Sequence, residues 1–470
     1  MNFSNAPVQI AIVGGGASGS LLAIQLLRQT RQPLHVLLIE RTGEFGRGVA
    51  YGTRCPDHLL NVPAGRMSAL PNEPEHFLRW LEARAGQPGF PAQADAGAFV
   101  PRHLFGTYLQ ELLAGTAADE PGSVLERVHG EVVDVDDSGP RLTLRFADGS
   151  TRTVDQLALA IGNLPGEYPI PRPLPVYKDS RYVHIPWQGD ALAGLRDDDD
   201  ILLVGHGLTA TDLIVQLHNR GHRGTIHALS RRGIRPQVHR LDVAPWPFPT
   251  PESIAPTIRA WTRAVREQIR LATAQGQDWR AVIDGLRPHT QTIWQRFSDA
   301  ERARFMRHVR PLWDAHRHRV PEATAAVVDQ MAAAGRLKFY AGRLQVLEAD
   351  EQGLHALVRH RRSIRHESLR VAKVINCTGA RTDYTKYQHP LLIHLLARGL
   401  IGHDPLALGI NALPTGEVIR YRGQPQPRIT TLGAPLKGVL WESTAIREIR
   451  QQAQTLASNL LAKCSQISVA

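Results

Sequence analysis

Cysteine is scarce in this chain, which has 470 residues but only three cysteines, Cys55, Cys377 and Cys464. None of the three stands in a Cys-x-x-Cys pair, and this excludes both a disulfide framework and a redox-active dithiol. The sequence also lacks any uncharged apolar run of about 18 residues, so a membrane span is not expected. Because no basic segment with a cleavage signature opens the chain, we expect a soluble protein of the reducing cytoplasm.

Aromatic residues make up only 6% of the sequence, and its basic residues are dispersed although the net charge is +11. Nucleic acids are bound by clustered basic residues interleaved with aromatic side chains, so we expect no nucleic-acid partner. A dispersed positive charge suits anionic dinucleotides and acidic small molecules instead. Histidines are frequent, at 21, but none stands at the spacing of a zinc site, so we expect no metal.

A strand–turn–helix–strand pattern lies near the N-terminus. Residues 8–14 predict a buried strand, and the turn Gly14-x-Gly16-x-x-Gly19 leads into a helical run. The next apolar strand ends at Glu40. Glycines in such a turn let a pyrophosphate approach the helix N-terminus, and the acid accepts hydrogen bonds from the adenosine ribose. This unit therefore predicts an FAD or NAD site and disfavours a 2′-phosphate.

A second unit of the same kind follows in the middle of the chain. Its turn carries Gly205 and Gly207, with alanine in the third glycine position, and its second strand ends in Arg231-Arg232 instead of an acid. Arginine forks bind phosphate dianions, so this unit predicts NADPH over NADH. The alternative is that both arginines are merely solvated. Two such units imply two different dinucleotides, the first held as the flavin and the second exchanged.

The order of the two units predicts the fold class: α/β, with two Rossmann-like dinucleotide-binding domains, the NADPH domain inserted in the FAD domain. A long helical insertion follows the second unit, and in it Ser298 and Glu301 are expected to form a capping box. The expected segments are the FAD domain at 1–165 and 373–470, the NADPH domain at 166–250 and 336–372, and the helical insertion at 251–335.

Several local motifs then carry a resemblance to a known family. They are the motif GRGVAYG at 46–52, the motif HLLNVPAGRMS at 58–68, GHRGTIHALSRRG at 221–233, and LGAPLKG at 432–438 followed by WESTA at 441–445. They resemble the bacterial FAD-NAD(P)-binding proteins, which have two dinucleotide-binding domains and are related to N-hydroxylating and flavin-containing monooxygenases. The resemblance runs nearly end to end and implies FAD and NADPH as cofactors.

The same resemblance extends to two segments where the chain crosses between domains. Residues 157–162 and 374–379 are similar to the family's apolar-strand-Thr-Gly motif, although isoleucine replaces the threonine in the first. Gly433 falls where the family's last FAD contact lies. The residues that we expect to contact FAD or NADPH are Gly14, Gly16, Ala17, Ser18, Gly19, Glu40, Arg41, Gly48, Val133, Gly162, Gly205, Gly207, Leu208, Thr209, Ser230, Arg231, Arg232, Thr378, Gly379 and Gly433.

Candidate catalytic residues come from the loop that follows the first unit, which we expect near the flavin ring. They are Asn61, Arg66 and Met67, with a packing role as the alternative for Met67. Arg310 and Arg317, in the most basic stretch of the helical insertion, are candidates for holding a substrate carboxylate by bidentate pairing. The alternative for these arginines is a solvated helix face.

Three functions remain open at this point. The first is an NADPH-dependent FAD monooxygenase that uses molecular oxygen on a small acidic or zwitterionic substrate; N-hydroxylation is what the resemblance implies. The second is an NADPH-dependent reductase or dehydrogenase that passes electrons to a carrier or quinone. The third is a flavin- or nucleotide-binding sensor without catalysis. The sequence indicates neither the substrate nor an oligomeric state.

Overall fold

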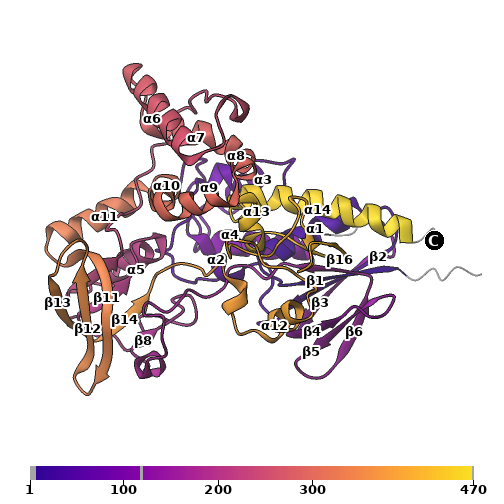
Figure 1. The fold of residues 1–470 in the computed structure, drawn as a ribbon, viewed down its shortest axis with the longest axis horizontal. Coiled ribbons are helices and arrows are strands. Elements are labelled where there is room, and N and C mark those ends of the chain that lie inside the picture. The colour runs from indigo at the N-terminus through magenta and orange to yellow at the C-terminus, as the bar shows by residue number, and fades with distance from the viewer. Residues whose placement is uncertain (1–6, 117–119, 468–470) are drawn as a thin grey trace, which may run out of the picture.

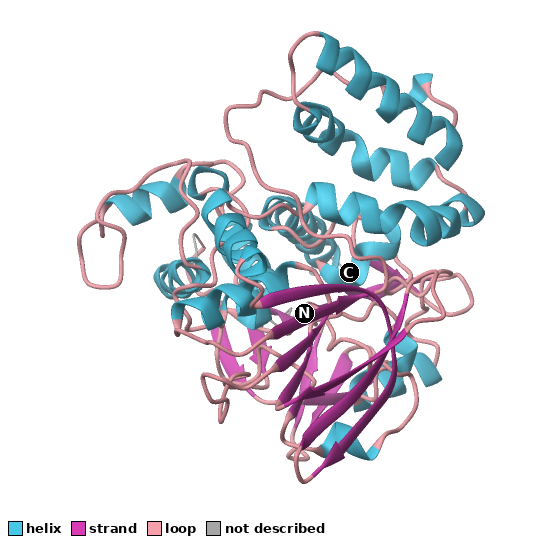
Figure 2. Cartoon of the chain, turned by 90° about the vertical axis from the view of Figure 1, so that its left-hand side faces the viewer, coloured by secondary structure: helices cyan, strands magenta, loops and turns pink. Residues whose placement is uncertain are grey.

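The structure, a computed structural model, describes residues 7–116 and 120–467 (Figure 1). Two sheets built mainly of parallel strands lie toward opposite ends of the long axis, and a lobe of helices stands beside them (Figures 1 and 2). The predicted fold class, two Rossmann-like domains with a helical insertion, is confirmed. No helix in these described ranges is long and apolar enough to cross a membrane.

The first domain combines segments from both ends of the chain. Its elements are β1 (Val8–Val13), α1 (Ala17–Gln29), β2 (Leu34–Glu40), α2 (Gly48–Tyr51), η1 (Ala64–Arg66), α3 (His76–Glu82), α4 (Arg102–Gly115), β3 (Val124–His129), β4 (Val132–Asp136), β5 (Leu142–Phe146), β6 (Thr151–Val154), β7 (Gln156–Leu159), η6 (Tyr384–Lys386), α12 (Pro390–Ala397), β15 (Glu417–Ile419), β16 (Pro425–Thr431), η7 (Ala434–Leu436), α13 (Lys437–Leu440) and α14 (Ile446–Ile467). Its main sheet has the order β15-β16-β7-β1-β2-β3.

The central strands β1 and β2 are mainly apolar because both faces of the sheet are covered there. Ile10 and Ile12 of β1 point into a core shared with α1, α4 and α14. Ala11 and Val13, which alternate with them, point to the other face, where β4, β5, β6 and α12 pack. The C-terminal helix α14 begins at Ile446.

The second domain carries a seven-stranded sheet of order β13-β12-β11-β10-β9-β14-β8. Its elements are η2 (Pro175–Lys178), β8 (Tyr182–Val183), β9 (Ile201–Val204), α5 (Leu208–Asn219), β10 (Ile226–Ser230), α11 (Glu322–Ala333), β11 (Leu337–Asp350), β12 (Gly353–His360), β13 (His366–Val371) and β14 (Lys373–Asn376). Helices α5 and α11 pack on one face of the sheet, around Ile214 and Met331.

Two boundaries differ from the prediction. The sequence predicts that the FAD domain resumes at residue 373, which would place β14 in that domain. In the structure β14 pairs in parallel with β9 and β8, so it belongs to the second sheet. A short apolar strand carries no local signal of the sheet that it joins. Helix α11 was assigned to the insertion, but it is the crossover helix that joins the parallel strands β10 and β11.

The remaining helices form the lobe at the top of Figure 1. They are η3 (Pro251–Ser253), α6 (Ile258–Ala274), α7 (Trp279–Leu286), η4 (Arg287–His289), α8 (Thr290–Arg296), α9 (Asp299–Arg304), η5 (Phe305–Val309) and α10 (Arg310–Arg317). The capping residue was predicted correctly, because the side chain of Ser298 accepts a hydrogen bond from the Glu301 amide. Trp261, Trp294 and Trp441 belong to one apolar cluster, which joins the lobe to the segment before α14.

Candidate functional site

The first glycine turn lies between β1 and α1. Gly14 has φ +107°, and a Cβ atom added there would lie 2.3 Å from the carbonyl oxygen of Ala160, so only glycine fits. Gly16 is the N-cap of α1, and the side chains that the structure describes do not cap the first turn. The free amides at this helix end, together with the helix dipole, suit a pyrophosphate group.

Two distant segments lie against the same helix end. A Cβ atom added to Gly16 would lie 3.1 Å from the Cα atom of Gly48, and one added to Gly433 would lie 2.8 Å from the Oγ atom of Ser18. The Gly433 amide also donates a hydrogen bond to Gln452 of α14, at 2.8 Å. Residues predicted from three separate motifs to contact FAD therefore surround the start of α1.

The acid predicted to hold the adenosine ribose stands beside this turn. The Oε2 atom of Glu40 accepts a hydrogen bond of 2.9 Å from the Gly15 amide, which keeps the carboxylate at the end of β2. Arg41 approaches Glu131 at 3.9 Å, and the carbonyl of Val133 accepts a hydrogen bond from a histidine of α12. The donor set, amides at the helix end and an acid after the second strand, fits FAD.

The second glycine turn repeats the construction of the first. Gly205 has φ +138°, and a Cβ atom there would lie 2.2 Å from the carbonyl oxygen of Cys377. Gly207 is the N-cap of α5, and a Cβ atom on it would meet no described atom within 4 Å. Leu208 and Thr209 form the first turn of the helix. Open space in front of a helix N-terminus again fits a pyrophosphate group.

The two segments that cross between the domains run side by side. Leu164 and Arg381 form an antiparallel bridge, and a Cβ atom on Gly166 would lie 2.7 Å from the carbonyl oxygen of Gly379. Gly162 and Thr378, which precede them, lie at the ends of β7 and β14, and the Thr378 hydroxyl donates to the side chain of Asn376. The predicted crossing points are thus neighbours in space.

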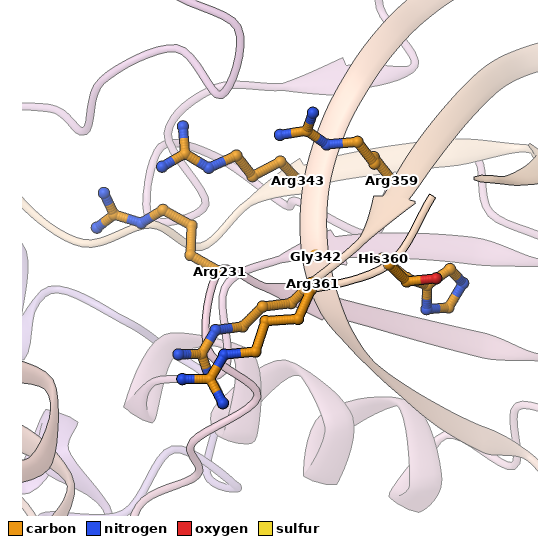
Figure 3. A pocket seen from close by; sticks show the side chains of 8 residues that line it. Arg231, Gly342, Arg343, Arg359, His360 and Arg361 are labelled. Carbon is orange, nitrogen blue, oxygen red and sulfur yellow. The ribbon is translucent and has the colours of Figure 1, made fainter. Parts of the chain in front are cut away.

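An arginine-rich pocket of about 280 Å³ opens at the end of β10. Arg231 lines it, and Figure 3 shows its side chain together with those of Arg343 and Arg361 extending to one side of the strands. Arg231 is exposed, but the loss of hydration beside its neighbours, and after it the like charges of Arg310 and Arg343, lowers its pKa. Sequence reasoning missed the arginines from β11 and β12, although Arg359 and Arg361 form a visible basic run after an apolar strand.

The neighbour of Arg231 has a different role. The guanidinium of Arg232 donates hydrogen bonds to the backbone carbonyls of Arg307 and His308 in the helical lobe, and Arg232 does not line the pocket. The two arginines were predicted together, but only Arg231 faces the space where a phosphate fits. Ser230, before them, accepts a hydrogen bond from the amide of Gly233 and so shapes the turn.

The three candidate catalytic residues separate in the structure. Met67 is only 4% exposed and packs in the core beneath α1, so it is a packing residue. Asn61 uses its backbone carbonyl to accept a hydrogen bond of 3.0 Å from the Nε2 atom of His239, which comes from the second domain. Arg66 is exposed at the end of η1. Of the three, Asn61 lies where the two domains meet.

The two candidate substrate arginines both lie on α10. The Nε atom of Arg310 donates a hydrogen bond to Asp314 at 3.3 Å. The positive charge of Arg310 lowers the pKa of both Arg231 and Lys437. Arg317 forms a buried ion pair of 3.5 Å with Glu442, and its own Nε atom is buried without a partner among the described residues. The side chain of Arg317 is only 11% exposed, whereas that of Arg310 is 34% exposed.

Glu442 is a member of this cluster that sequence reasoning did not connect to it. Its carboxylate accepts hydrogen bonds from the Trp313 indole at 3.1 Å and from Arg317. Burial alone would raise the pKa of Glu442, but Arg317 and then His318 hold it below the usual value. Burial in turn lowers the pKa of His318. These residues form a buried cluster at the base of the lobe, in which the carboxylate of Glu442 lies beside the guanidinium of Arg317 and the indole of Trp313.

Comparison with known proteins supports the assignment of the first domain as a dinucleotide-binding domain. The sequence model of a family described as FAD-NAD(P)-binding matches residues 11–164. A salicylate hydroxylase of Sarocladium schorii is 32% identical over 171 residues, which are 32% of this chain and 34% of that protein. The chain thus spans about a third of the length of that curated relative.

Solved structures match over nearly the whole chain. An ornithine N-hydroxylase of Kutzneria sp. 744, solved with reduced FAD, NADP⁺ and L-ornithine, superposes with a TM-score of 0.67 at 15% identity over 98% of this chain and 100% of that one. A cadaverine monooxygenase of Erwinia amylovora, solved with FAD, gives 0.66 at 14% identity over 96% of this chain and 94% of that one. A thioredoxin reductase of Lactococcus lactis gives 0.51 at 12% identity, over 97% of this chain and 99% of that one. At such identities the likeness shows the fold.

Proposed function

We propose that this chain, whose residues 11–164 belong to the FAD-NAD(P)-binding family, is an NADPH-dependent FAD monooxygenase for a small acidic or zwitterionic substrate. The observation that carries the proposal is the pair of dinucleotide sites in one chain. One glycine turn has Glu40 beside it, and the other leads to Arg231 in an arginine-lined pocket. Bound FAD supplies the means of passing electrons from the nicotinamide to oxygen.

The residues of the chain bind and orient the two dinucleotides. The amides at the starts of α1 and α5 hold the two pyrophosphates, and Glu40 holds the ribose of the flavin dinucleotide. Arg231 holds the phosphate that distinguishes NADPH from NADH. The crossing segments that lead to the two sites are in contact at Gly166 and Gly379.

The substrate class is argued from α10. The charge of Arg310 lowers the pKa of both Arg231 and Lys437, and its guanidinium is bonded in the described chain only to Asp314, at 3.3 Å. A carboxylate there gains a bidentate partner and neutralises part of the local positive charge. Glu442, ionised beside Arg317, suits the amino group of a zwitterion. The folds of the ornithine and cadaverine enzymes make N-hydroxylation of an amino compound the leading reaction.

Oxygen uptake with NADPH, measured across a panel of amines and amino acids, tests the proposal. A true substrate raises both NADPH oxidation and oxygen uptake, and product forms without peroxide release. An enzyme that consumes NADPH only with a quinone or a protein carrier, and never responds to a panel member, is a reductase instead. If NADPH fails to bleach the bound flavin at all, the protein is not an NADPH-dependent enzyme.

A further inference from the structure

The pocket after β10 holds far more positive charge than the sequence motif led us to expect. Five arginines and one histidine contribute to its wall. The lining residues are Arg231, Gly342, Arg343, Arg359, His360, Arg361, Arg362 and Ser363. Figure 3 shows the ring of His360 pointing away from the arginine side chains, and that ring hydrogen-bonds to Glu367 at 2.9 Å. The open space is therefore surrounded by guanidinium groups.

The sheet itself builds this arrangement. Ser230, just before Arg231, lies beside Ala341 in the parallel β10–β11 pair. Strand β11 continues past this edge and pairs with β12, which places Arg343 directly opposite Arg359. The amide of Arg361 then donates to the carbonyl of Ala341 at 2.8 Å. Residues separated by more than a hundred positions thus converge on one point at the end of β10.

The pocket gathers like charges, and all five of its arginines are exposed to solvent. Arginines directly opposite each other on paired strands repel, as Arg343 and Arg359 do. Arg362 has φ +57°, in the left-handed region that disfavours residues with a side chain. Within the described residues, no ion pair or side-chain hydrogen bond neutralises any of the five pocket arginines. Nearby Arg365, by contrast, pairs with Glu367 at 3.6 Å, and Arg370 pairs with Asp350 at 2.7 Å.

The ligand follows from the position of the pocket in the fold. In a strand–glycine turn–helix–strand unit, the end of the second strand is where the 2′ position of the adenosine ribose lies. A phosphate monoester dianion accepts bidentate bonds from guanidinium groups. We propose that Arg343 and Arg361, from β11 and the end of β12, complete with Arg231 a binding site for the 2′-phosphate of NADPH. This inference rests on the proposed function, because it assigns the second dinucleotide site to NADPH.

The site makes a further distinction between the two arginines of the sequence motif. The guanidinium of Arg232 is hydrogen-bonded to backbone carbonyls of the helical lobe. Arginines of the β11–β12 hairpin therefore take the role in phosphate binding that the sequence motif suggested for Arg232. Specificity for NADPH therefore resides in the β11–β12 hairpin as much as in Arg231. The remaining charges, Arg359 and Arg362, raise the local positive potential and attract the dianion from solution.

A pair of ligands that differ only in the 2′-phosphate tests this assignment on the FAD-loaded protein. Calorimetry compares adenosine 2′,5′-bisphosphate with adenosine 5′-monophosphate, which lacks the 2′-phosphate. Arg343→Ala and Arg361→Ala should each weaken bisphosphate binding about ten- to a hundredfold and leave monophosphate binding unchanged. Arg365→Ala is the matched control, since Arg365 lies on the same hairpin outside the pocket, and it should leave both affinities unchanged.

Two outcomes overturn the assignment. In one, the wild-type protein binds both nucleotides equally. In the other, the two pocket variants bind the bisphosphate as the wild-type protein does while their melting temperatures are unchanged. Inorganic phosphate, added as a competitor, distinguishes a site that binds any phosphate from a site that needs the nucleotide. If the nucleotide is needed, inorganic phosphate displaces the bisphosphate only at millimolar concentration.

The same experiment separates this inference from the proposed function, because binding needs no turnover. If the pocket variants lose bisphosphate selectivity but NADPH does not reduce the flavin, the phosphate site stands and the proposed reaction fails. If NADPH reduces the flavin and drives oxygenation but the variants bind both nucleotides as the wild type does, the reaction stands and the assignment of Arg343 and Arg361 fails.

Discussion

Arg102 at the start of α4 and Asp212 in α5 form a salt bridge of 2.8 Å that joins the two dinucleotide-binding domains. The same guanidinium donates a hydrogen bond of 3.0 Å to the carbonyl of Leu59 and lies 5.7 Å from the ring centroid of Trp187. Asp212 is 8% exposed, and its burial raises the pKa to about 6, although Arg102 opposes the shift. The contact that fixes the two sites relative to each other therefore contains a titrating group.

This group predicts a pH dependence of stability. The folded protein holds a proton on Asp212 more tightly than the unfolded chain, whose pKa is near 3.8. Its contribution to the free energy of unfolding is therefore greatest below pH 3.8 and is lost as the pH rises to about 6, by up to about 3 kcal/mol. Asp212→Asn should remove this part of the slope in urea unfolding between pH 4 and pH 7. A constant difference between variant and wild type across that range would contradict the assignment.

The FAD site predicts a glycine requirement that is specific to position. Gly16→Val places a side chain against Gly48, where an added Cβ atom already lies 3.1 Å from the Cα atom, and in front of the amides of α1. Flavin content of the purified protein should fall below about a tenth of the wild-type value, as measured by absorption after flavin release. Gly115→Val is the control, since a Cβ atom there meets no described atom within 4 Å. Equal flavin content in both variants would disprove the site.

Local motifs of this kind were predictable because their function depends on residues that are neighbours in sequence. Each glycine turn falls, with the helix it opens, within a single strand–helix–strand unit, and Glu40 ends the first of the two units. Gly433 is different, because its place beside Ser18 depends on the return of the chain after more than four hundred residues. That position came from the family resemblance and not from any pattern within the segment.

Other parts of the site could not be predicted for the same reason. The contact between Arg343 and the pocket of Arg231 depends on the register of β11 beside β10, which no local pattern encodes. The partner of Arg317 is Glu442, 125 positions away. Met67 was a candidate because its loop follows the first dinucleotide unit, yet its side chain enters the core, which was the alternative interpretation. Sequence patterns locate an element, but packing decides which side of it faces a ligand.

The two arginines at the end of β10 should differ in their effect on cofactor choice. Arg231→Ala should raise the KM for NADPH about ten- to a hundredfold and leave the KM for NADH nearly unchanged, because a charge-assisted bond to the 2′-phosphate is lost. Arg232→Ala should change the NADPH to NADH ratio much less, since its guanidinium is bonded to carbonyls of the lobe. Steady-state constants for both cofactors decide this. Equal efficiency with NADH in the unmutated enzyme would refute the NADPH assignment.

The arginines of α10 predict a separation between substrate binding and flavin reduction. Arg310→Ala should raise the KM of the substrate identified in the oxygen-uptake panel about tenfold, the loss expected for one charge-assisted bond. The rate of flavin reduction by NADPH should stay nearly unchanged in stopped-flow measurements, because that step does not involve the substrate carboxylate. Arg307→Ala, an exposed arginine one turn earlier, is the control. A normal substrate KM in the Arg310 variant, or a substrate that proves to be a neutral hydrophobe, would sink the idea.

Arg317 calls for a different experiment, because its loss has two consequences. Arg317→Ala leaves the carboxylate of Glu442 buried without its cation, which should cost about 3–5 kcal/mol of stability in addition to any effect on the substrate. The double variant Arg317→Met with Glu442→Gln removes both charges and should recover most of that stability, as judged by thermal unfolding. If Arg317 or Glu442 also contacts the substrate, the double variant regains stability but keeps a substrate KM raised about tenfold. A double variant that regains both stability and the wild-type KM would show that Arg317 serves only to neutralise Glu442, which would leave Arg310 as the substrate-binding arginine of the helix.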